Sequence, residues 1–342
     1  MNILSYCDDV RTEWDDFVVA QPEGTLFHLI AWKRAVERAF SFEARYLLAQ
    51  ENGRIRGVLP LFRSSNWVQG QTLISTPFAV YGGICSSDPA ASIALRAAAC
   101  RMATEDDVNY LELREPYRPF GDGFLTKELY VTFEQPLTKD AEQLMRGFPK
   151  DTRYMIRKAQ KNGLRAVTDN TQLDSFYEIY AQSVRNLGTP VFSRRFFRIL
   201  LEEFGTTVEV TVIRQDSKSL AGVLSFRFRD AIQPYYGGSL PEGRQFGANN
   251  FMYWEVLRTA CERGLRTFDF GRSKLGTGSY FFKTQWNMRS RPLPYQFYLV
   301  RRKNLPNFSP ANPSFKLATS LWRRIPLPLT KTLGPSLVRL FP

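Results

Sequence analysis

The residues best suited to chemistry lie in the second half of the chain. A predicted strand ends in Gly-Gly-Ser, and Arg244-Gln-Phe-Gly247-Ala248-Asn249 then opens a predicted helix over 250–263. The first N–H groups of a helix are unpaired and carry partial positive charge, and a glycine lets an anion approach the backbone closely. Arg244, Gly247, Ala248 and Asn249 are therefore predicted to bind phosphate; the alternative is an ordinary glycine turn with Asn249 as the helix cap.

The net charge of +13 needs an anionic partner or a solvated basic surface. Residues 301–342 carry eight Lys and Arg residues and no Asp or Glu, and a second basic concentration runs over 150–165. Both segments suit a phosphate-bearing donor, RNA or lipid headgroups. A basic surface that only contacts solvent is the alternative for either segment.

Several classes of site are disfavoured by what the chain contains. The single histidine, His28, lies in an apolar stretch and is expected to be a satisfied core or capping residue. The four cysteines are far apart and lack metal-ligand spacing, so neither a histidine triad nor a metal site is expected. The N-terminus lacks the pattern of a signal peptide, and no apolar run approaches the ~20 residues that span a bilayer. We expect a cytoplasmic protein.

The positioning elements repeat one order: helices, a meander of strands, then helix and strand. Predicted helices cover 10–19, 31–40, 90–106, 151–162, 174–187, 194–204 and 250–263. Predicted strands cover 45–50, 54–62, 72–76, 110–114, 129–134, 207–214, 220–229, 231–237, 267–270 and 293–300. Glu-Asn-Gly joins the first two strands as a hairpin. The expected fold is α/β (α+β), with a mixed, mainly antiparallel sheet flanked by helices in each half.

The expected domains are 1–145, 146–300 and a proline-rich basic tail over 301–342. In the tail, 315–325 is the only segment predicted to be helical. It interleaves apolar residues with Lys316, Arg323 and Arg324. Such a helix either lies on an anionic membrane surface or packs back on the protein with its cations outward.

Several motifs resemble a known family. The Arg244–Asn249 turn resembles the pyrophosphate loop of GNAT acetyltransferases, (R/Q)xxGx(G/A), although Asn249 departs from it. The wider chain resembles the FemABX family, which has two tandem GNAT-like domains and transfers amino acids from aminoacyl-tRNA to peptidoglycan precursors. The motifs are Arg153-Tyr-Met-Ile-Arg157-Lys, Tyr236-Gly-Gly-Ser, Arg266-Thr-Phe-Asp-Phe-Gly and Tyr280-Phe-Phe-Lys-Thr. With Trp322-Arg-Arg-Ile-Pro-Leu-Pro, the chain looks like the FemAB-related branch encoded with exopolysaccharide and PEP-CTERM protein-sorting systems.

The resemblance implies roles for individual residues. Phe282 and Lys283 would lie at the transfer centre, where the ammonium would stabilise charge that develops on the donor. Tyr236 would contact the acceptor, and Arg34 would take the place of a lysine that contacts acceptor phosphate. Arg153 and Arg157 of the basic helix are also expected to bind substrate. The family's arginine and tyrosine for a nucleotide-linked muropeptide fall near Phe192 and Phe196, which cannot pair with phosphate, so the resemblance does not carry over the classical acceptor. The helical arm of some members is absent, and with the Arg244–Asn249 turn this favours a CoA-like donor over tRNA.

Proton transfer needs a further group, since an ammonium acceptor loses a proton before it attacks. Asp269, at the end of a predicted strand, is the best carboxylate; the alternative is an aspartate that bonds its own loop.

The function implied is transfer of an acyl or aminoacyl group to an amine of a cell-envelope or exopolysaccharide precursor at the inner membrane face. The donor would be acyl-CoA or aminoacyl-tRNA, with no permanently bound cofactor and no metal. Two alternatives differ in class. One is a membrane-peripheral scaffold without catalysis, held by residues 305–342. The other is an RNA-binding protein that uses the 150–165 helix with Tyr154.

Overall fold

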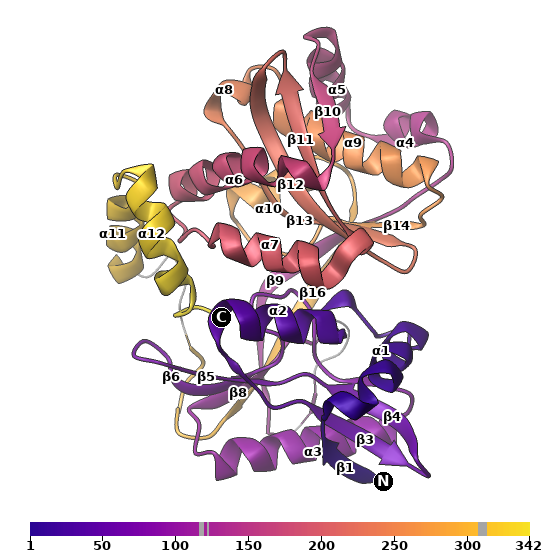
Figure 1. Ribbon diagram of the computed structural model, residues 1–342, viewed down its shortest axis with the longest axis vertical. Coiled ribbons are helices and arrows are strands. Elements are labelled where there is room, and N and C mark those ends of the chain that lie inside the picture. The colour runs from indigo at the N-terminus through magenta and orange to yellow at the C-terminus, as the bar shows by residue number, and fades with distance from the viewer. Residues whose placement is uncertain (116–119, 122, 307–312) are drawn as a thin grey trace. The chain divides into compact units, whose positions relative to one another are not determined.

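The computed structural model describes residues 1–115, 120–121, 123–306 and 313–342, with side chains from 317 onward in the last range. The chain divides into two compact units (Figure 1). Unit 1 comprises Met1–Leu129, Leu293–Asn307 and Ser336–Pro342, and unit 2 comprises Tyr130–Pro292 and Phe308–Pro335. Each unit is a mixed α/β structure with strands flanked by helices, which confirms the expected fold class.

Unit 1 has two groups of strands. One is a four-stranded sheet in the order β1-β3-β4-β7, and the other has the order β16-β8-β6-β5-β2. The bounds are β1 Asn2–Ser5, β2 Glu43–Ala44, β3 Leu47–Glu51, β4 Arg54–Leu59, β5 Phe62–Asn66, β6 Gly70–Ile74, β7 Cys85–Ser86, β8 Tyr110–Leu113 and β16 Arg289–Leu299. The helices are η1 Asp8–Val10, α1 Arg11–Ala20, η2 Leu26–His28, α2 Ile30–Phe40 and α3 Pro89–Glu105. The predicted hairpin is confirmed: β3 and β4 pair antiparallel, and Asn52 and Gly53 have φ of 51° and 74°.

Unit 2 is built on strands in the order β10-β11-β12-β13-β14-β9, with β15 also paired to β9. The bounds are β9 Leu125–Pro136, β10 Arg165–Thr168, β11 Val208–Gln215, β12 Lys218–Phe228, β13 Ala231–Ser239, β14 Thr267–Asp269 and β15 Ser273–Lys274. The helices are α4 Ala141–Gly147, α5 Lys150–Lys161, η3 Asn170–Gln172, α6 Leu173–Leu187, α7 Arg194–Phe204, η4 Gly205–Thr207, α8 Pro241–Arg244, α9 Ala248–Glu262 and α10 Gly278–Thr284.

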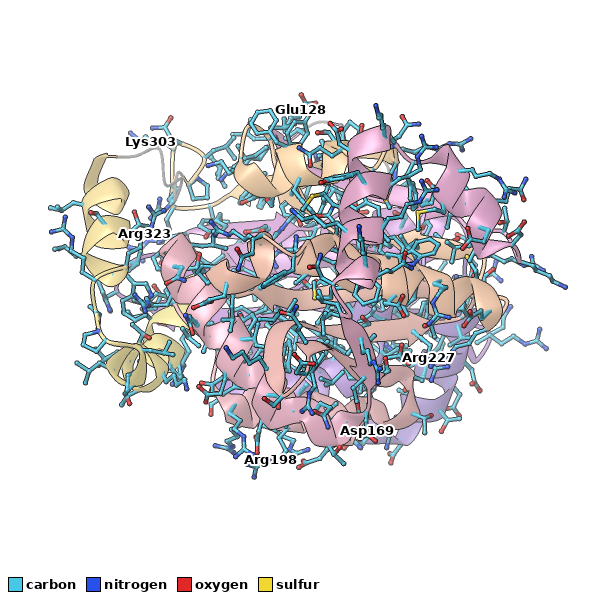
Figure 2. The ribbon with its side chains drawn as sticks, turned by 90° about the horizontal axis from the view of Figure 1, so that it is seen from above. Glu128, Asp169, Arg198, Arg227, Lys303 and Arg323 are labelled. Carbon is cyan, nitrogen blue, oxygen red and sulfur yellow. The ribbon has the colours of Figure 1, made fainter. Side chains whose placement is uncertain are left out.

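Two helices cover opposite faces of the unit 2 sheet. A Cβ at Gly237 would meet Tyr253 of α9, whereas one at Gly238 would meet Ser183 and Tyr180 of α6. Neighbouring residues of a strand point to opposite faces, so α9 and α6 lie on the two sides of β13. Figure 2 shows Arg198 of α7, among other charged side chains, projecting outward.

The units do not follow the expected boundaries at 145 and 300. The reason is that the two ends of each of the long strands β9 and β16 belong to different units. Residues 134–136 of β9 pair with β14 in unit 2, whereas residues 296–299 of β16 pair with β8 in unit 1. The tail is divided too, between unit 2 up to Pro335 and unit 1 from Ser336.

One local expectation, that of a single helix in the tail, is wrong. The tail has a second helix, α12 (Leu327–Val338), beside α11 (Pro313–Trp322); proline-rich sequence hides it, although Pro328 sits in the first turn, where no N–H partner is lost. The helix α5 begins after Pro149, and the Thr152 hydroxyl in its first turn donates to the Gln285 carbonyl at 2.7 Å.

Candidate active site

The strands β13 and β14 part shortly after they begin. They pair in parallel only at Ala231 with Thr267 and Ile232 with Phe268, and β13 then continues to Ser239 while β14 ends at Asp269. An irregular register between β12 and β13 leaves Tyr235 as an extra residue at this point. A bulge bends its strand, so it helps β13 to leave its neighbour. Beyond the split, β13 backbone groups on this side have no β14 partner.

Asp269 sits at the point where the strands part. Its Oδ1 accepts from the Thr132 hydroxyl at 3.0 Å and from the Gly271 N–H at 2.8 Å, and its Oδ2 accepts from the Gln233 amide at 2.9 Å. Both oxygens are therefore engaged by β9, β13 and its own loop. This arrangement favours the alternative left open by the sequence, in which the aspartate holds its loop in place.

The predicted phosphate-binding turn lies at the start of α9. Gly247 precedes the helix with φ of 75°, no side chain caps it, and a Cβ there would lie 2.5 Å from the Met155 carbonyl oxygen of α5. Only glycine fits this close contact in a left-handed conformation. Asn249 is in the first turn and is not the cap. The Arg244 side chain is exposed and makes no hydrogen bond or ion pair within the described ranges, while its carbonyl accepts from the Gly247 N–H at 3.1 Å.

Lys283 is buried rather than solvated. Its Nζ donates to the carbonyls of Phe270 at 2.5 Å, Gly271 at 2.9 Å and Arg272 at 3.2 Å. Burial lowers the pKa of Lys283 to about 7. The negative charge of Asp269 has the opposite effect on this pKa but is the smaller of the two. The ammonium therefore fixes the loop that follows β14, and its longest bond, to Arg272, is the one most easily exchanged for another acceptor.

Phe282 belongs to an aromatic cluster on the α9 side of the split. Its ring centroid is 6.1 Å from that of Phe270 and 5.7 Å from that of Tyr253. The Tyr253 hydroxyl would be 3.3 Å from a Cβ at Gly237 and has no hydrogen bond within the described part of the chain. Burial raises the pKa of Tyr253 to about 12, so the phenol stays neutral and can donate. The sequence analysis did not identify Tyr253. The available signal was its position four residues after Asn249, which places both residues on the same face of α9.

Tyr236 lies on the other face. Its ring packs against those of Tyr180, Phe192, Phe196 and Phe197. The Tyr236 hydroxyl is buried and has no hydrogen-bond partner among the described residues. Burial also raises its pKa well above 10. A buried hydroxyl without a partner costs free energy, and such atoms commonly mark a binding site.

The predicted arginines lie on two helices that belong to different units, α2 of unit 1 and α5 of unit 2. Arg153 is half-buried on α5 and donates to the Arg146 carbonyl at 3.0 Å, and Arg157 is exposed. Arg34 lies on α2 in unit 1 and is half-buried, whereas Trp32 on the same helix is fully buried. Their roles in binding substrate stay predictions.

The single histidine lies in a capping position in unit 1. His28 is buried, with Nδ1 2.8 Å from the Thr25 hydroxyl and Nε2 3.0 Å from the Gly83 carbonyl, which confirms a satisfied residue in a capping position. The residues that the structure describes hold no group of three His, Cys, Asp or Glu side chains placed to bind a metal. Within the same residues, no helix is long and apolar enough to cross a bilayer.

Known proteins resemble this chain in one domain and in overall fold. Residues 146–284 match the family model described as the acetyltransferase (GNAT) domain. No curated protein matches the chain. Among solved structures, FemX has a TM-score of 0.70 and 17% identity, over 88% of this chain and 98% of FemX. A tandem GNAT protein from the clavulanic acid biosynthesis pathway has a TM-score of 0.55 and 12% identity, over 89% and 99% of the two chains.

A third similar structure is the C-terminal domain of a protein described as a lysylphosphatidylglycerol synthetase from Agrobacterium fabrum. It has a TM-score of 0.57 and 12% identity, over 95% of this chain and 96% of that domain. The low identities make these likenesses of fold, and the match over 146–284 adds the GNAT domain itself. The expected resemblance is confirmed at the level of fold: residues 146–284 match a GNAT domain, and the whole chain is similar in fold to FemX and to a tandem GNAT protein.

Proposed function

We propose that the chain transfers an acyl or aminoacyl group from an activated donor to an amine of a cell-envelope or exopolysaccharide precursor. The observation that carries this proposal is the split between β13 and β14. The start of α9 and Tyr253 lie on one face of the sheet beside it, and Tyr236 with its unpartnered hydroxyl lies on the other. A donor can therefore enter from the α9 face and an acceptor from the α6 face, to meet at the split.

An acyl-CoA is the favoured donor. The uncapped N-terminus of α9 offers N–H groups and a positive dipole end to a pyrophosphate, with the unpaired guanidinium of Arg244 one turn before it. The contact between Gly247 and Met155 also brings the basic helix α5 against this turn. A charged tRNA would use the same positive charge but would extend over α5.

In the proposed reaction the neutral amine attacks the carbonyl carbon of the thioester, a C–N bond forms, and the C–S bond breaks. The amine loses one proton and the leaving thiolate gains one, so the products are an amide and a free thiol. Tyr253 is placed to donate a hydrogen bond to the donor at the split. Lys283 would lend positive charge to the developing oxyanion through the N–H that now reaches Arg272. Asp269 is proposed as a positioning residue.

We further propose that the tail brings the enzyme to an anionic membrane surface. The pairs Leu317 and Leu321 on α11, and Leu329 and Leu333 on α12, are each spaced by four residues and are half or more exposed. Meanwhile Trp322 is buried and donates to the Thr189 carbonyl at 2.9 Å, which docks α11 on unit 2. Exposed leucines beside basic residues are typical of a surface-bound helix.

The donor is identified by titration calorimetry of the full chain with acetyl-CoA, longer acyl-CoAs and aminoacyl-tRNA. Arg244→Ala is expected to weaken acyl-CoA binding about tenfold, because one charge-assisted contact to phosphate is lost. Arg198→Ala, which removes an exposed arginine of α7 in the same unit, is the matched control. Equal affinity of both variants and wild type for every donor would remove Arg244 from the site.

The noncatalytic alternatives predict different outcomes. An RNA-binding protein that uses the exposed Tyr154 of α5 would bind uncharged RNA as tightly as aminoacyl-tRNA and would not bind acyl-CoA. A scaffold would float with vesicles of phosphatidylglycerol and phosphatidylcholine without any donor binding. Leu321→Ser with Leu329→Ser is expected to abolish flotation and to leave donor affinity unchanged.

A further inference from the structure

Unit 1 contains an open cavity of about 820 Å³ that plays no part in the proposed transfer site. Among the residues that the structure describes, its lining includes three carboxyl residues, Glu23, Asp88 and Glu115, and three serines, Ser86, Ser87 and Ser92, and no Lys or Arg. In a chain of net charge +13, this acidic lining stands out against the basic average. Opposite charge attracts a cationic ligand to such a cavity.

Glu115 is the lining residue best placed to bind a ligand in this cavity. It is only 7% exposed, and one carboxylate oxygen accepts from the Ile84 N–H at 2.7 Å. A Cβ at Gly83 would lie 2.1 Å from the same oxygen, so the carboxyl packs flat on a glycine. The other oxygen has no hydrogen bond within the described residues. A buried carboxyl with one free oxygen calls for a donor from a ligand.

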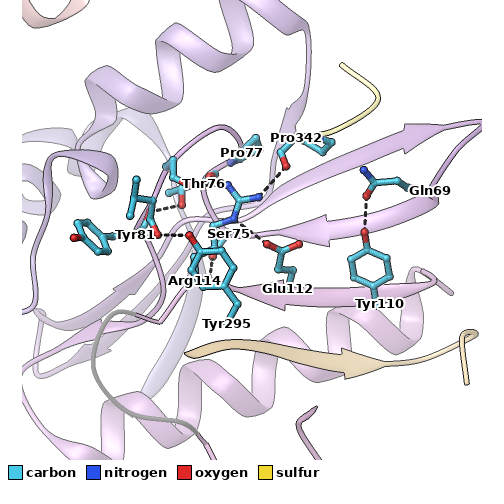
Figure 3. A network of polar contacts seen from close by, with 12 residues as sticks. Gln69, Ser75, Thr76, Pro77, Tyr81, Tyr110, Glu112, Arg114, Tyr295 and Pro342 are labelled. Atoms are coloured by element: carbon cyan, nitrogen blue, oxygen red, sulfur yellow. Dashed lines mark hydrogen bonds and ion pairs between the residues drawn. The ribbon is translucent and has the colours of Figure 1, made fainter. Parts of the chain in front are cut away.

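The loop that holds Glu115 is fixed on its other side. Arg114, the preceding residue, donates to the carbonyls of Thr76 at 3.0 Å and Ala79 at 2.9 Å (Figure 3). Thr76 and Phe78 have φ of 46° and 63°, an uncommon backbone for residues other than glycine. Strained backbone held by surrounding bonds is typical of preorganised sites. The Ile84 N–H is therefore presented to Glu115 by a rigid loop.

The other charged groups near the cavity leave Glu115 as the buried carboxyl group most available to a ligand. Asp88 already caps α3, through the Ala91 N–H at 2.9 Å, and pairs with Arg56 at 3.0 Å. Glu23 is exposed. The Arg96 guanidinium stacks on the ring of Phe120, 5.0 Å from its centroid, and its charge favours ionisation of Glu115 while that of Glu23 opposes it.

We propose that this cavity binds a small molecule that carries an aliphatic ammonium group, which pairs with Glu115 while the serine hydroxyls bond its polar groups. This proposal is independent of the transfer reaction, because it rests on residues of unit 1 alone.

The first experiment is titration calorimetry of the full chain at pH 7 with putrescine, and with 1,4-butanediol as its uncharged counterpart. Wild type is expected to bind putrescine and not the diol. Glu115→Gln keeps an oxygen that can accept from Ile84 but loses the charge, and it should weaken putrescine binding at least tenfold. Glu105→Gln, at the exposed end of α3, removes the same charge away from the cavity and should bind as wild type does. Ser92→Phe fills the cavity from α3 and should also abolish binding.

Protons provide a second readout that a nonspecific attraction would not give. Burial raises the pKa of Glu115 to about 8, so the carboxyl is mostly protonated at pH 7. Pairing with an ammonium requires the carboxylate, so binding at pH 7 releases up to one proton to the buffer and less at pH 9. Calorimetry in two buffers of different ionisation enthalpy measures this release. Absence of putrescine binding by wild type, or equal binding by Glu115→Gln, overturns the proposal.

Discussion

Replacement of Lys283 by methionine tests how a buried ammonium is accommodated beside the split. The unfolded chain keeps the Lys283 proton up to its ordinary pKa of 10.5, whereas the folded protein releases it near pH 7. Between these two values the unfolded state binds more protons, so the stability contributed by this residue rises with pH across that window. At 1.36 kcal/mol for each pKa unit, the full window corresponds to about 5 kcal/mol. This is an upper bound, since the three carbonyls favour the charged form.

The assay is guanidinium denaturation of wild type and Lys283→Met at pH 7, 8.5 and 10. Methionine fills a similar volume without charge, so the variant should gain stability relative to wild type at pH 7 and lose that advantage by several kcal/mol toward pH 10. Lys161→Met, at the exposed end of α5, controls for the change in net charge. A wild type-to-variant difference that is the same at all three pH values would refute a buried lysine of lowered pKa.

The same variant separates two roles of the lysine in catalysis. If the ammonium stabilises charge in the transition state, Lys283→Met lowers kcat on the order of a hundredfold, with little change in KM for the donor. The wild-type kcat should then also fall as pH rises through about 7, since the ammonium is lost. If Lys283 only fixes the Phe270–Arg272 loop, methionine leaves this pH profile in place and raises KM instead.

Three further substitutions probe other parts of the chain. Tyr236→Phe removes a buried hydroxyl without a partner and should leave thermal stability equal or higher while raising KM for the acceptor; an unchanged KM would remove Tyr236 from the acceptor site. Gly247→Ala forces a Cβ into a left-handed residue against Met155, so chemical denaturation should show a loss of more than about 1 kcal/mol together with weaker donor binding. Arg114→Leu leaves Glu112, its partner at 2.9 Å, buried and unpaired, and should cost about 3–5 kcal/mol in the same assay.

Local features of the fold were predictable because each depends on a short stretch of sequence. The Asn52-Gly53 hairpin follows from two residues that tolerate positive φ, and the placement of His28 follows from its apolar surroundings. The unit boundaries were not predictable, because they depend on which ends of β9 and β16 pair with which strands. The helix α12 was hidden by Pro328 and Pro335, since the sequence cannot show that packing offsets a helix-breaking residue.

In the candidate site, too, the sequence indicated which residues matter but not which groups they contact. The family resemblance pointed to Lys283, and Asp269 was the best carboxylate in the sequence; in the structure the charge of Asp269 raises the pKa of Lys283. The sequence could not indicate what their polar atoms bind, since the carbonyls that accept from Lys283 belong to backbone and carry no sequence signature. Tyr253 and Glu115 were missed for a related reason. Each becomes notable only because a distant glycine, Gly237 or Gly83, allows the backbone to approach its polar atoms, and such a contact exists only in three dimensions.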